Sequence, residues 1–306
     1  MVSLQTQMRP STREYQQIVR ALLVRVLRNP AVLTKMSAAE LDLTIRVARR
    51  VRLLGRLAVD LQKGGIFDSL PQVVQDQLQS ALVLAESRSR VASWELDRIA
   101  WALSDLSDFS PIVMKGCTYM LLDLPNNRGR VFADVDLMVG EIELEELEAQ
   151  LNKHGWQTRE LTPYDDNYYR KWTHELPPLV HPEREVEIDL HHNILPRTAR
   201  LKPDAEKMLA AARPVAGSHY RVLCDEDVVL HAMVHLMFAD EMADKLRDLV
   251  DIDDMLRHFS GQDDDFWERL VTRAAELDLR RPAYYSLHFA RKLLDCPVPE
   301  STVDSI

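Results

Sequence analysis

Cysteine, glycine and long apolar runs are all scarce in this chain of 306 residues. Its 9 glycines are about half the usual share of roughly 7%, and this scarcity favours a helix-rich fold. An odd number of cysteines without C-x-x-C spacing supports neither a disulfide framework nor a zinc ribbon. These cysteines are Cys117, Cys224 and Cys296, and their pattern fits a reducing compartment.

Segments suited to membrane insertion or secretion are also missing from the sequence. The longest strongly apolar run, VVLHAMVHLMFA, has only 12 residues and contains two histidines, so it is too short to span a bilayer. The start, MVSLQTQMRPSTREY, lacks the apolar segment and the small-residue cleavage site of a secretory signal. We therefore expect a soluble, cytoplasmic protein that does not interact with membranes.

Three common motifs of nucleotide and phosphate chemistry are absent. The sequence contains neither G-x-x-x-x-G-K-[ST] nor G-x-G-x-x-G, so P-loop and Rossmann folds have no support. No histidine is followed by aspartate, which removes support for phosphohydrolases built on a His-Asp dipeptide.

The composition is that of a globular protein of more than one subdomain. Hydrophobic residues make up 46% of the chain and charged residues 28%, which is ordinary for a folded protein. A chain of this length exceeds the usual size of one compact core, so two or three subdomains are expected. The net charge of −10 argues against a general nucleic-acid binder, because such binding depends on attraction to phosphates.

The charge is unevenly distributed along the sequence. Residues 1–65 hold 12 Lys/Arg against 4 Asp/Glu, whereas residues 66–306 hold 26 against 44. The basic stretch has two interpretations, which the sequence leaves open. It is either a solvated helix face docked on the acidic remainder, or an anion-facing surface for a triphosphate or an RNA.

Helical periodicity dominates the first third of the sequence. Apolar residues recur at helical spacing over residues 11–27 and 37–61. The second of these helices opens with Ser37 and Glu40 in the order of a capping box. A third helix is expected over residues 71–108.

The middle of the sequence mixes short strands with helices. Strands are predicted over residues 111–116 and 131–139, followed by a helix over residues 141–155. Residues 173–193 predict two strands joined by a turn. The helical pattern returns from about Pro203 and is interrupted only by the segment HYRVL.

This layout predicts an α+β fold, in which a small mixed β-sheet core is flanked by helical domains and helices predominate overall. The expected division is an N-terminal helical domain over residues 1–109, a core over residues 110–200 and a C-terminal helical domain over residues 201–306.

Two aspartates lie one residue apart in an apolar, β-branched segment, RVFADVDLMVG. Successive side chains of a strand point to opposite faces, so Asp134 and Asp136 share one face while Val135 and Leu137 take the other. Carboxylates this close repel each other unless a cation lies between them, and Mg²⁺ is the ion that prefers such oxygen ligands. The simpler interpretation is an exposed polar strand face, although aspartate is disfavoured in strands.

A third aspartate supports the metal interpretation. In the segment EVEIDLHHN, Glu187, Asp189 and His191 alternate with apolar residues, so they share one face of a second strand. If this strand belongs to the same sheet, Asp189 is brought beside Asp134 and Asp136. The sequence therefore predicts a metal centre with three carboxylates.

Two other groups of candidate ligands have simpler interpretations. Asp251, Asp253 and Asp254 in VDIDDM lie in a helical pattern, where residues i and i+2 face apart, and are expected on a solvated helix face. His231 and His235 have the i, i+4 spacing of zinc ligands, but the glutamate of H-E-x-x-H is missing. A packed or interface pair is the favoured interpretation of these histidines.

The segments VMKG, RVFADVDLMV and VEIDLHHNI occur in this order. They resemble the lysine-glycine, Arg-x-x-(Ser/Ala)-Asp-h-Asp-h-h-h and h-Asp-Leu-His segments of nucleotidyltransferases of the DNA polymerase β superfamily. The closest resemblance is to the group known as uncharacterised nucleotidyltransferases, and it covers roughly residues 110–260. One departure is that Gly116 is followed by Cys117, where members of the superfamily commonly carry Gly-Ser.

The resemblance implies a metal-dependent nucleotidyltransferase. Asp134, Asp136 and Asp189 would be both metal ligands and catalytic residues, holding two Mg²⁺ ions about 3.5 to 4 Å apart, or Mn²⁺ in their place. A nucleoside monophosphate would pass from a nucleoside triphosphate such as ATP to an acceptor hydroxyl, with release of pyrophosphate. Asp189 would also help to orient or deprotonate that hydroxyl.

The resemblance also implies a binding site for the triphosphate. Lys115, Gly116, Cys117 and Arg130 are the residues expected there, with Gly116 allowing the backbone to approach the phosphates. For Arg130 a surface salt bridge is the competing interpretation. The acceptor, which could be a small molecule, a peptide, a protein or an RNA end, is not specified by the sequence. The alternative function is a catalytically degenerate core that serves as a binding or regulatory module.

Overall fold

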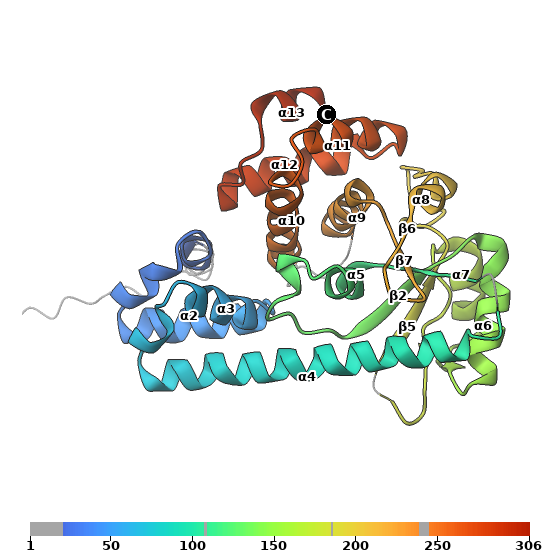
Figure 1. Cartoon of the computed structure of the whole chain (residues 1–306), viewed down its shortest axis with the longest axis horizontal. Coiled ribbons are helices and arrows are strands. Elements are labelled where there is room, and N and C mark those ends of the chain that lie inside the picture. Colours follow the sequence, from blue (N-terminus) through green and yellow to red (C-terminus); the bar gives the residue numbers. More distant parts are fainter. Residues whose placement is uncertain (1–20, 107–108, 185, 239–244) are drawn as a thin grey trace, which may run out of the picture.

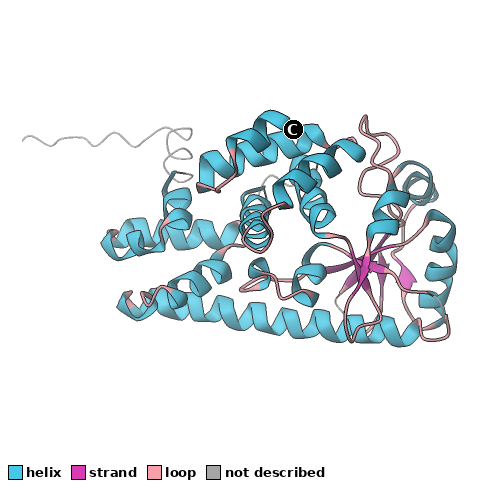
Figure 2. Cartoon of the chain, turned by 45° about the horizontal axis from the view of Figure 1, so that its top comes forward, coloured by secondary structure: helices cyan, strands magenta, loops and turns pink. Residues whose placement is uncertain are grey.

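The structure is a computed structural model, and it describes residues 21–106, 109–184, 186–238 and 245–306. Helices surround one mixed sheet of seven strands in the order β3-β4-β5-β2-β1-β7-β6 (Figure 1). Figure 2 shows the strands gathered in one region, with helices packed around them. The predicted helix-rich α+β class is thus confirmed. Among the described residues, none of the helices combines the length and apolar character that crossing a bilayer requires.

The N-terminal part is helical, as predicted. Residues 21–28 form a helix, while the first part of the helix predicted over residues 11–27 lies outside the described residues. The predicted capping box is present at the start of α2, where the Ser37 hydroxyl accepts from the Glu40 amide at 3.4 Å and Glu40 accepts from the Ser37 amide at 2.9 Å. The elements are η1 (Pro30–Lys35), α2 (Ala38–Arg50), α3 (Leu54–Lys63), η2 (Phe67–Ser69) and α4 (Gln72–Ala102).

The central segment supplies most of the sheet, and the two strands predicted within residues 173–193 are present. Its elements are β1 (Ile112–Val113), α5 (Lys115–Leu121), η3 (Pro125–Asn127), β2 (Asp134–Met138), η4 (Glu141–Glu143), α6 (Leu144–Lys153), β3 (Gln157–Thr158), α7 (Pro163–Trp172), β4 (Leu179–Val180) and β5 (Glu187–His191). The remaining elements are α8 (Ala205–Ala211), β6 (Arg213–Pro214), β7 (Arg221–Val222), α9 (Asp225–Phe238), α10 (Lys245–Ser260), α11 (Phe266–Glu276), α12 (Arg280–Leu294) and α13 (Glu300–Ser305).

The strands β2 and β5 are parallel neighbours in the middle of the sheet, and each has one apolar face. Val135 and Leu137 of β2 and Ile188 and Leu190 of β5 are fully buried. They pack in one core with the C-terminal half of α4 and with α6. Because side chains alternate along a strand, the polar residues of both strands turn to the opposite face, toward α5 and α9.

Three hydrophobic cores lie side by side in the molecule. The first joins α2, α3 and the start of α4, the second joins the end of α4, the sheet and α6, and the third joins α9 to α12. The long helix α4 runs beneath the first two cores in Figure 1. The division into domains at residues 109 and 200 stays a prediction.

The basic N-terminal helices pack against the acidic remainder. Arg56 of α3 forms an ion pair with Asp254 of α10. Arg28 pairs with Asp295 at 3.1 Å and donates to the carbonyl of Leu293 at 2.8 Å, at the C-terminal end of α12. The first interpretation of the basic stretch, docking on the acidic part of the chain, is confirmed for these residues.

The interpretation of VDIDDM as a solvated helix face is wrong for two of its three aspartates. Asp251 and Asp254 are buried in α10, with 6% and 7% of their surface exposed. Asp251 pairs with Arg130 and Asp254 with Arg56. The helix α10 is covered by α9 and α12 and by arginines of distant segments, so its polar residues are enclosed rather than solvated. Only Asp253 pairs locally, with Arg257.

Candidate active site

Two of the predicted carboxylates stand side by side on the polar face of the sheet. Asp136 of β2 and Asp189 of β5 are partners in the parallel register, and Asp134 is the partner of Glu187 one step earlier. Oxygens of Asp136 and Asp189 lie within 4.8 Å of each other and of a ring nitrogen of His191. Asp134 begins β2 and is exposed, at the edge of the cavity described below.

Asp136 is the most enclosed member of the group. It is 1% exposed, and one oxygen contacts both Lys115 Nζ at 2.6 Å and His191 Nε2 at 2.9 Å. Burial alone would raise its pKa, but the charge of Lys115 and the hydrogen bonds from His191 and Lys115 outweigh burial and hold the pKa of Asp136 well below its usual range. Asp136 is therefore ionised at neutral pH.

The other two carboxylates are affected by that fixed negative charge. Burial, together with the charge of Asp136, raises the pKa of Asp189 to about 7. The pKa of Asp134 is also raised, chiefly by the charge of Asp136; desolvation contributes less, because this side chain reaches solvent at the edge of the cavity. An ionised carboxylate that opposes the ionisation of two neighbouring carboxylates gives the site the donor chemistry that suits a hard divalent cation. The residues present thus fit Mg²⁺ or Mn²⁺.

The predicted triphosphate residues Lys115 and Gly116 form the first turn of α5. Lys115 has a positive φ of 47°, which is uncommon for a residue with a side chain. A Cβ atom on Gly116 would lie 3.2 Å from the Phe132 ring and 3.3 Å from Arg130 Nε, so the absence of a side chain keeps this turn close to the segment before β2.

Cys117 does not present its side chain to the cavity. The thiol is buried in the core beneath the sheet, and its sulfur lies 3.7 Å from the backbone oxygen of Asp134. Burial, and then the charges of Asp136 and Asp134, raises the pKa of this thiol above its usual value. Cys117 therefore packs as a small apolar residue.

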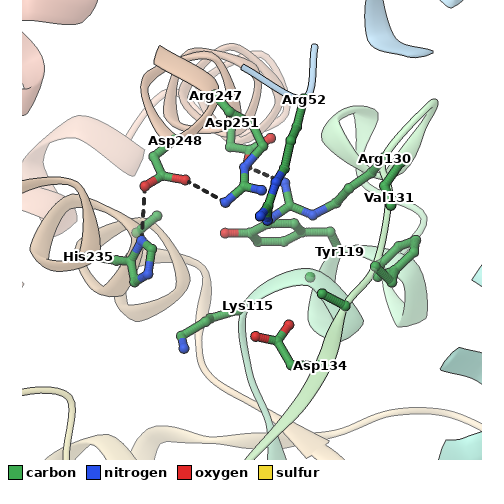
Figure 3. Close-up of a pocket in the computed structure, with 14 residues that line it drawn as sticks. Arg52, Lys115, Tyr119, Arg130, Val131, Asp134, His235, Arg247, Asp248 and Asp251 are labelled. Atoms are coloured by element: carbon green, nitrogen blue, oxygen red, sulfur yellow. Dashed lines mark hydrogen bonds and ion pairs between the residues drawn. The ribbon is translucent and has the colours of Figure 1, made fainter. Parts of the chain in front are cut away.

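A cavity of about 360 Å³ adjoins Asp134 and Lys115 (Figure 3). It lies where the three hydrophobic cores meet, because Arg52 follows α2, Lys115 begins α5, and His235 and Arg247 belong to α9 and α10. Four basic side chains face three acidic ones around it. The lining residues are Arg52, Lys115, Gly116, Tyr119, Arg130, Val131, Phe132, Ala133, Asp134, Ala232, His235, Arg247, Asp248 and Asp251.

Arg130 is held in a buried ion pair rather than the surface salt bridge that was its competing interpretation. Its side chain is 13% exposed and pairs with Asp251, and its guanidinium lies 5.1 Å from the centre of the Tyr119 ring. Figure 3 shows Arg130, Arg52 and Arg247 converging above Tyr119. Arg130 thus borders the cavity while its charge is largely neutralised by Asp251.

The zinc interpretation of His231 and His235 has no support in the geometry. His235 Nδ1 lies 3.0 Å from Asp248, which also contacts Arg247 at 3.3 Å, and His231 is buried. Among the described residues, no group of side chains able to share one ion includes either histidine. The packed interpretation fits His231, whereas His235 borders the cavity with 34% of its side chain exposed.

Sequence reasoning missed Arg247 as a residue of this cavity, whereas Arg52 belongs to the basic stretch for which an anion-facing surface was one interpretation. Arg52 lies in the turn after α2 and Arg247 in α10, and only the packing of the helices places them near β2. His191 had a recognisable signal, because it is two residues beyond Asp189 on the same strand face.

Comparison with known proteins identifies a family. A family model described as "Uncharacterised nucleotidyltransferase" matches residues 37–295. No curated protein matches the chain. A solved structure, the crystal structure of JHP933 from Helicobacter pylori, is similar with a TM-score of 0.35 and 11% identity, over 69% of this chain and 92% of that chain. At that TM-score the likeness supports no conclusion.

Proposed function

Because the chain belongs to this family of uncharacterised nucleotidyltransferases, we propose that it is a metal-dependent enzyme. It transfers a nucleoside monophosphate from a nucleoside triphosphate, such as ATP, to an acceptor hydroxyl and releases pyrophosphate. The observation that carries this proposal is the pairing of Asp136 with Asp189 on neighbouring strands, with Asp134 next to a cavity lined by basic side chains.

The three carboxylates are the proposed metal ligands. Asp134, Asp136 and Asp189 would hold Mg²⁺, which when bound supplies positive charge at the reacting phosphate and at the attacking and leaving oxygens. Lys115 already lies against Asp136 and would remain near the charge that develops on the leaving pyrophosphate. Asp189, on the neighbouring strand, would accept a hydrogen bond from the acceptor hydroxyl and orient it.

The cavity is the proposed site of the triphosphate. Arg52 and Arg247 approach it from two different helical cores, and Gly116 of α5 is among the residues that line it. Arginine suits this position because its planar group binds phosphate oxygens in pairs and stays charged. The three unpaired cysteines support a reducing compartment, so the cytoplasm is the proposed location.

The second candidate function is a degenerate module that binds nucleotides without transferring them. Two observations favour it. Lys115 Nζ donates a hydrogen bond of 2.6 Å to an oxygen of Asp136 and so competes with a metal ion for that oxygen. The buried Cys117 has no hydroxyl that could bind a phosphate. Retention of all three carboxylates favours the enzyme.

A labelling experiment separates the two functions. The purified protein is incubated with each of the four nucleoside triphosphates, labelled at either the α- or the γ-phosphate, with Mg²⁺ and a cell extract that supplies acceptors. The enzyme attaches only the α-label to an acceptor and releases the γ-label in pyrophosphate, and a chelator abolishes both events. Mg²⁺-dependent nucleotide binding without transfer of either label would establish the degenerate module. Absence of both binding and transfer would refute the proposed function.

A further inference from the structure

A short extended segment borders the sheet beside the carboxylate centre. Glu175 forms an isolated antiparallel bridge with His191, next to the hydrogen bond from the Leu176 amide to the Leu190 oxygen at 2.9 Å. The His192 amide donates to the His174 oxygen at 2.9 Å. The backbone therefore fixes His174 and Glu175 next to the end of β5, where His191 lies.

The side chains of these residues converge. His191 Nδ1 lies 3.3 Å from the Glu175 carboxylate, and the rings of His174 and His191 have centres 5.4 Å apart. One donor atom from each of His174, Glu175 and His191 lies within 4.8 Å of the other two. His191 has no exposed surface, whereas the side chains of His174 and Glu175 are 26% and 25% exposed, so the group is open to solvent on one side.

The hydrogen bonds of His191 identify which ring nitrogen faces the group. Its Nε2 lies 2.9 Å from an oxygen of Asp136, and an ionised carboxylate can only accept, so Nε2 carries the proton. The other ring nitrogen, Nδ1, faces the carboxylate of Glu175 at 3.3 Å. The Nδ1 atoms of both His174 and His191 are buried without a hydrogen-bond partner.

Buried donors and acceptors without partners are rare. A bound cation would give a buried ring nitrogen of this group a partner. The contact of Asp136 with the far side of the His191 ring is also the arrangement that orients metal-binding histidines, in which a carboxylate accepts the second N–H.

We propose that His174, Glu175 and His191 form a binding site for one transition-metal ion of the Zn²⁺ class, next to the carboxylate centre and distinct from it. Two imidazoles and one carboxylate are ligands that Zn²⁺ and Co²⁺ accept, and three protein ligands leave positions open for water or another ligand. The hard ion Mg²⁺ prefers oxygen ligands and is not expected here. The proposal does not rest on nucleotide transfer.

The test is a Co²⁺ titration of the full chain, freed of metal and then supplied with excess Mg²⁺ so that the oxygen ligands are occupied. We expect one equivalent of Co²⁺ to bind with visible absorption bands, and Zn²⁺ to displace it. His174→Gln and Glu175→Gln should each weaken Co²⁺ binding by about tenfold or more. Both residues are partly exposed, and Glu175→Gln preserves the size of the side chain, so circular dichroism should show an intact fold.

Two control variants locate the bound ion. His235→Gln removes a histidine from the cavity, and Asp134→Asn removes a carboxylate of the proposed Mg²⁺ centre, so both should retain Co²⁺ binding. Co²⁺ binding that persists in His174→Gln and Glu175→Gln, or that is lost in Asp134→Asn instead, would overturn the proposal. So would nitrogen-15 spectra that show a proton on His191 Nδ1 in the metal-free protein, because a doubly protonated ring could then bridge Asp136 and Glu175 without a metal.

Discussion

At the scale of single residues, the carboxylates of β2 and β5 destabilise each other in the metal-free protein. The pKa of Asp189 is raised to about 7 by burial and by the charge of Asp136, whereas an aspartate in an unfolded chain titrates near about 3.9. Between these values the folded state binds more protons than the unfolded state. The contribution of Asp189 to the free energy of unfolding therefore decreases as the pH rises from about 4 to about 7.

The variant Asp189→Asn should remove this penalty. An amide does not ionise, so the metal-free variant should melt at a higher temperature than the native protein above about pH 7, by about 1–2 °C for each kcal/mol relieved. The difference should shrink toward about pH 5, where the native carboxyl stays protonated in the folded state. Melting curves of both proteins across this range measure the effect. A difference in melting temperature that does not depend on pH would show that Asp189 is not strained by Asp136.

At the scale of elements, two glycines allow α3 to pack against the loop that carries Arg130. A Cβ atom on Gly55 would lie 2.2 Å from the backbone oxygen of Gly129, and one on Gly129 would lie 2.3 Å from the backbone of Gly55. Backbone atoms at such distances cannot move aside as a flexible side chain can. This contact places the turn with Arg52 next to the cavity.

Gly129→Ala should therefore destabilise the protein more than Gly217→Ala does. Both glycines have a positive φ, 69° and 72°, so the two variants share the conformational strain of alanine in that region. Nothing lies within 4 Å of the added methyl group at Gly217. We expect Gly129→Ala to lower the free energy of unfolding by about 1–3 kcal/mol more than its control, as overpacking does. Urea denaturation measures the free energy of unfolding of both variants. Equal losses would mean that the loop with Gly129 shifts at little energetic cost to accommodate the methyl group.

The sequence predicted those helices and strands in which the order of apolar and polar residues matches the buried and polar faces of the element. Alternation in β2 and β5 is visible because one face of each strand meets a core and the other holds polar groups. The helix α10 was misinterpreted because the usual polar face of a helix is solvated, whereas here Arg56 and Arg130 reach its aspartates from distant segments. Strands of two residues, such as β3 and β7, are too short to show a period.

The site residues that could be predicted from the sequence are likewise those that belong to a local pattern. Asp134, Asp136 and Asp189 share strand faces within a motif, and the structure brings Asp136 and Asp189 together. Arg52 and Arg247 owe their positions to packing between helices far apart in the sequence, and no local pattern encodes that packing.

At the scale of the whole molecule, the cavity receives side chains from the parts of the chain that form all three cores. A bound triphosphate should therefore contact these parts at once and stabilise them jointly. A ligand that binds only the folded state stabilises it by about 2.7 kcal/mol at a hundredfold excess over its dissociation constant. We expect the preferred nucleoside triphosphate, with Mg²⁺, to raise the melting temperature of the entire chain in one transition.

The arginines that border the cavity should carry much of that stabilisation. Arg52→Gln and Arg247→Gln should each reduce the thermal shift caused by the triphosphate. Arg46→Gln is the matched control, because Arg46 belongs to the same basic segment as Arg52 but pairs with Asp42 on an exposed helix face. A thermal shift that all three variants retain would place the triphosphate outside this cavity.

The proposed role of these carboxylates in nucleotide transfer can be measured by comparing the transfer rates of one matched pair of variants. Asp136→Asn keeps the size of the side chain but removes one charge from the proposed metal centre, whereas Asp253→Asn changes an aspartate that pairs with Arg257 on α10. With α-labelled triphosphate and extract, we expect Asp136→Asn to lower the rate about a hundredfold or more, since metal ions contribute several kcal/mol to such reactions. Asp253→Asn should transfer at nearly the native rate. Equal rates in the two variants would contradict the assignment of Asp136 to the catalytic centre.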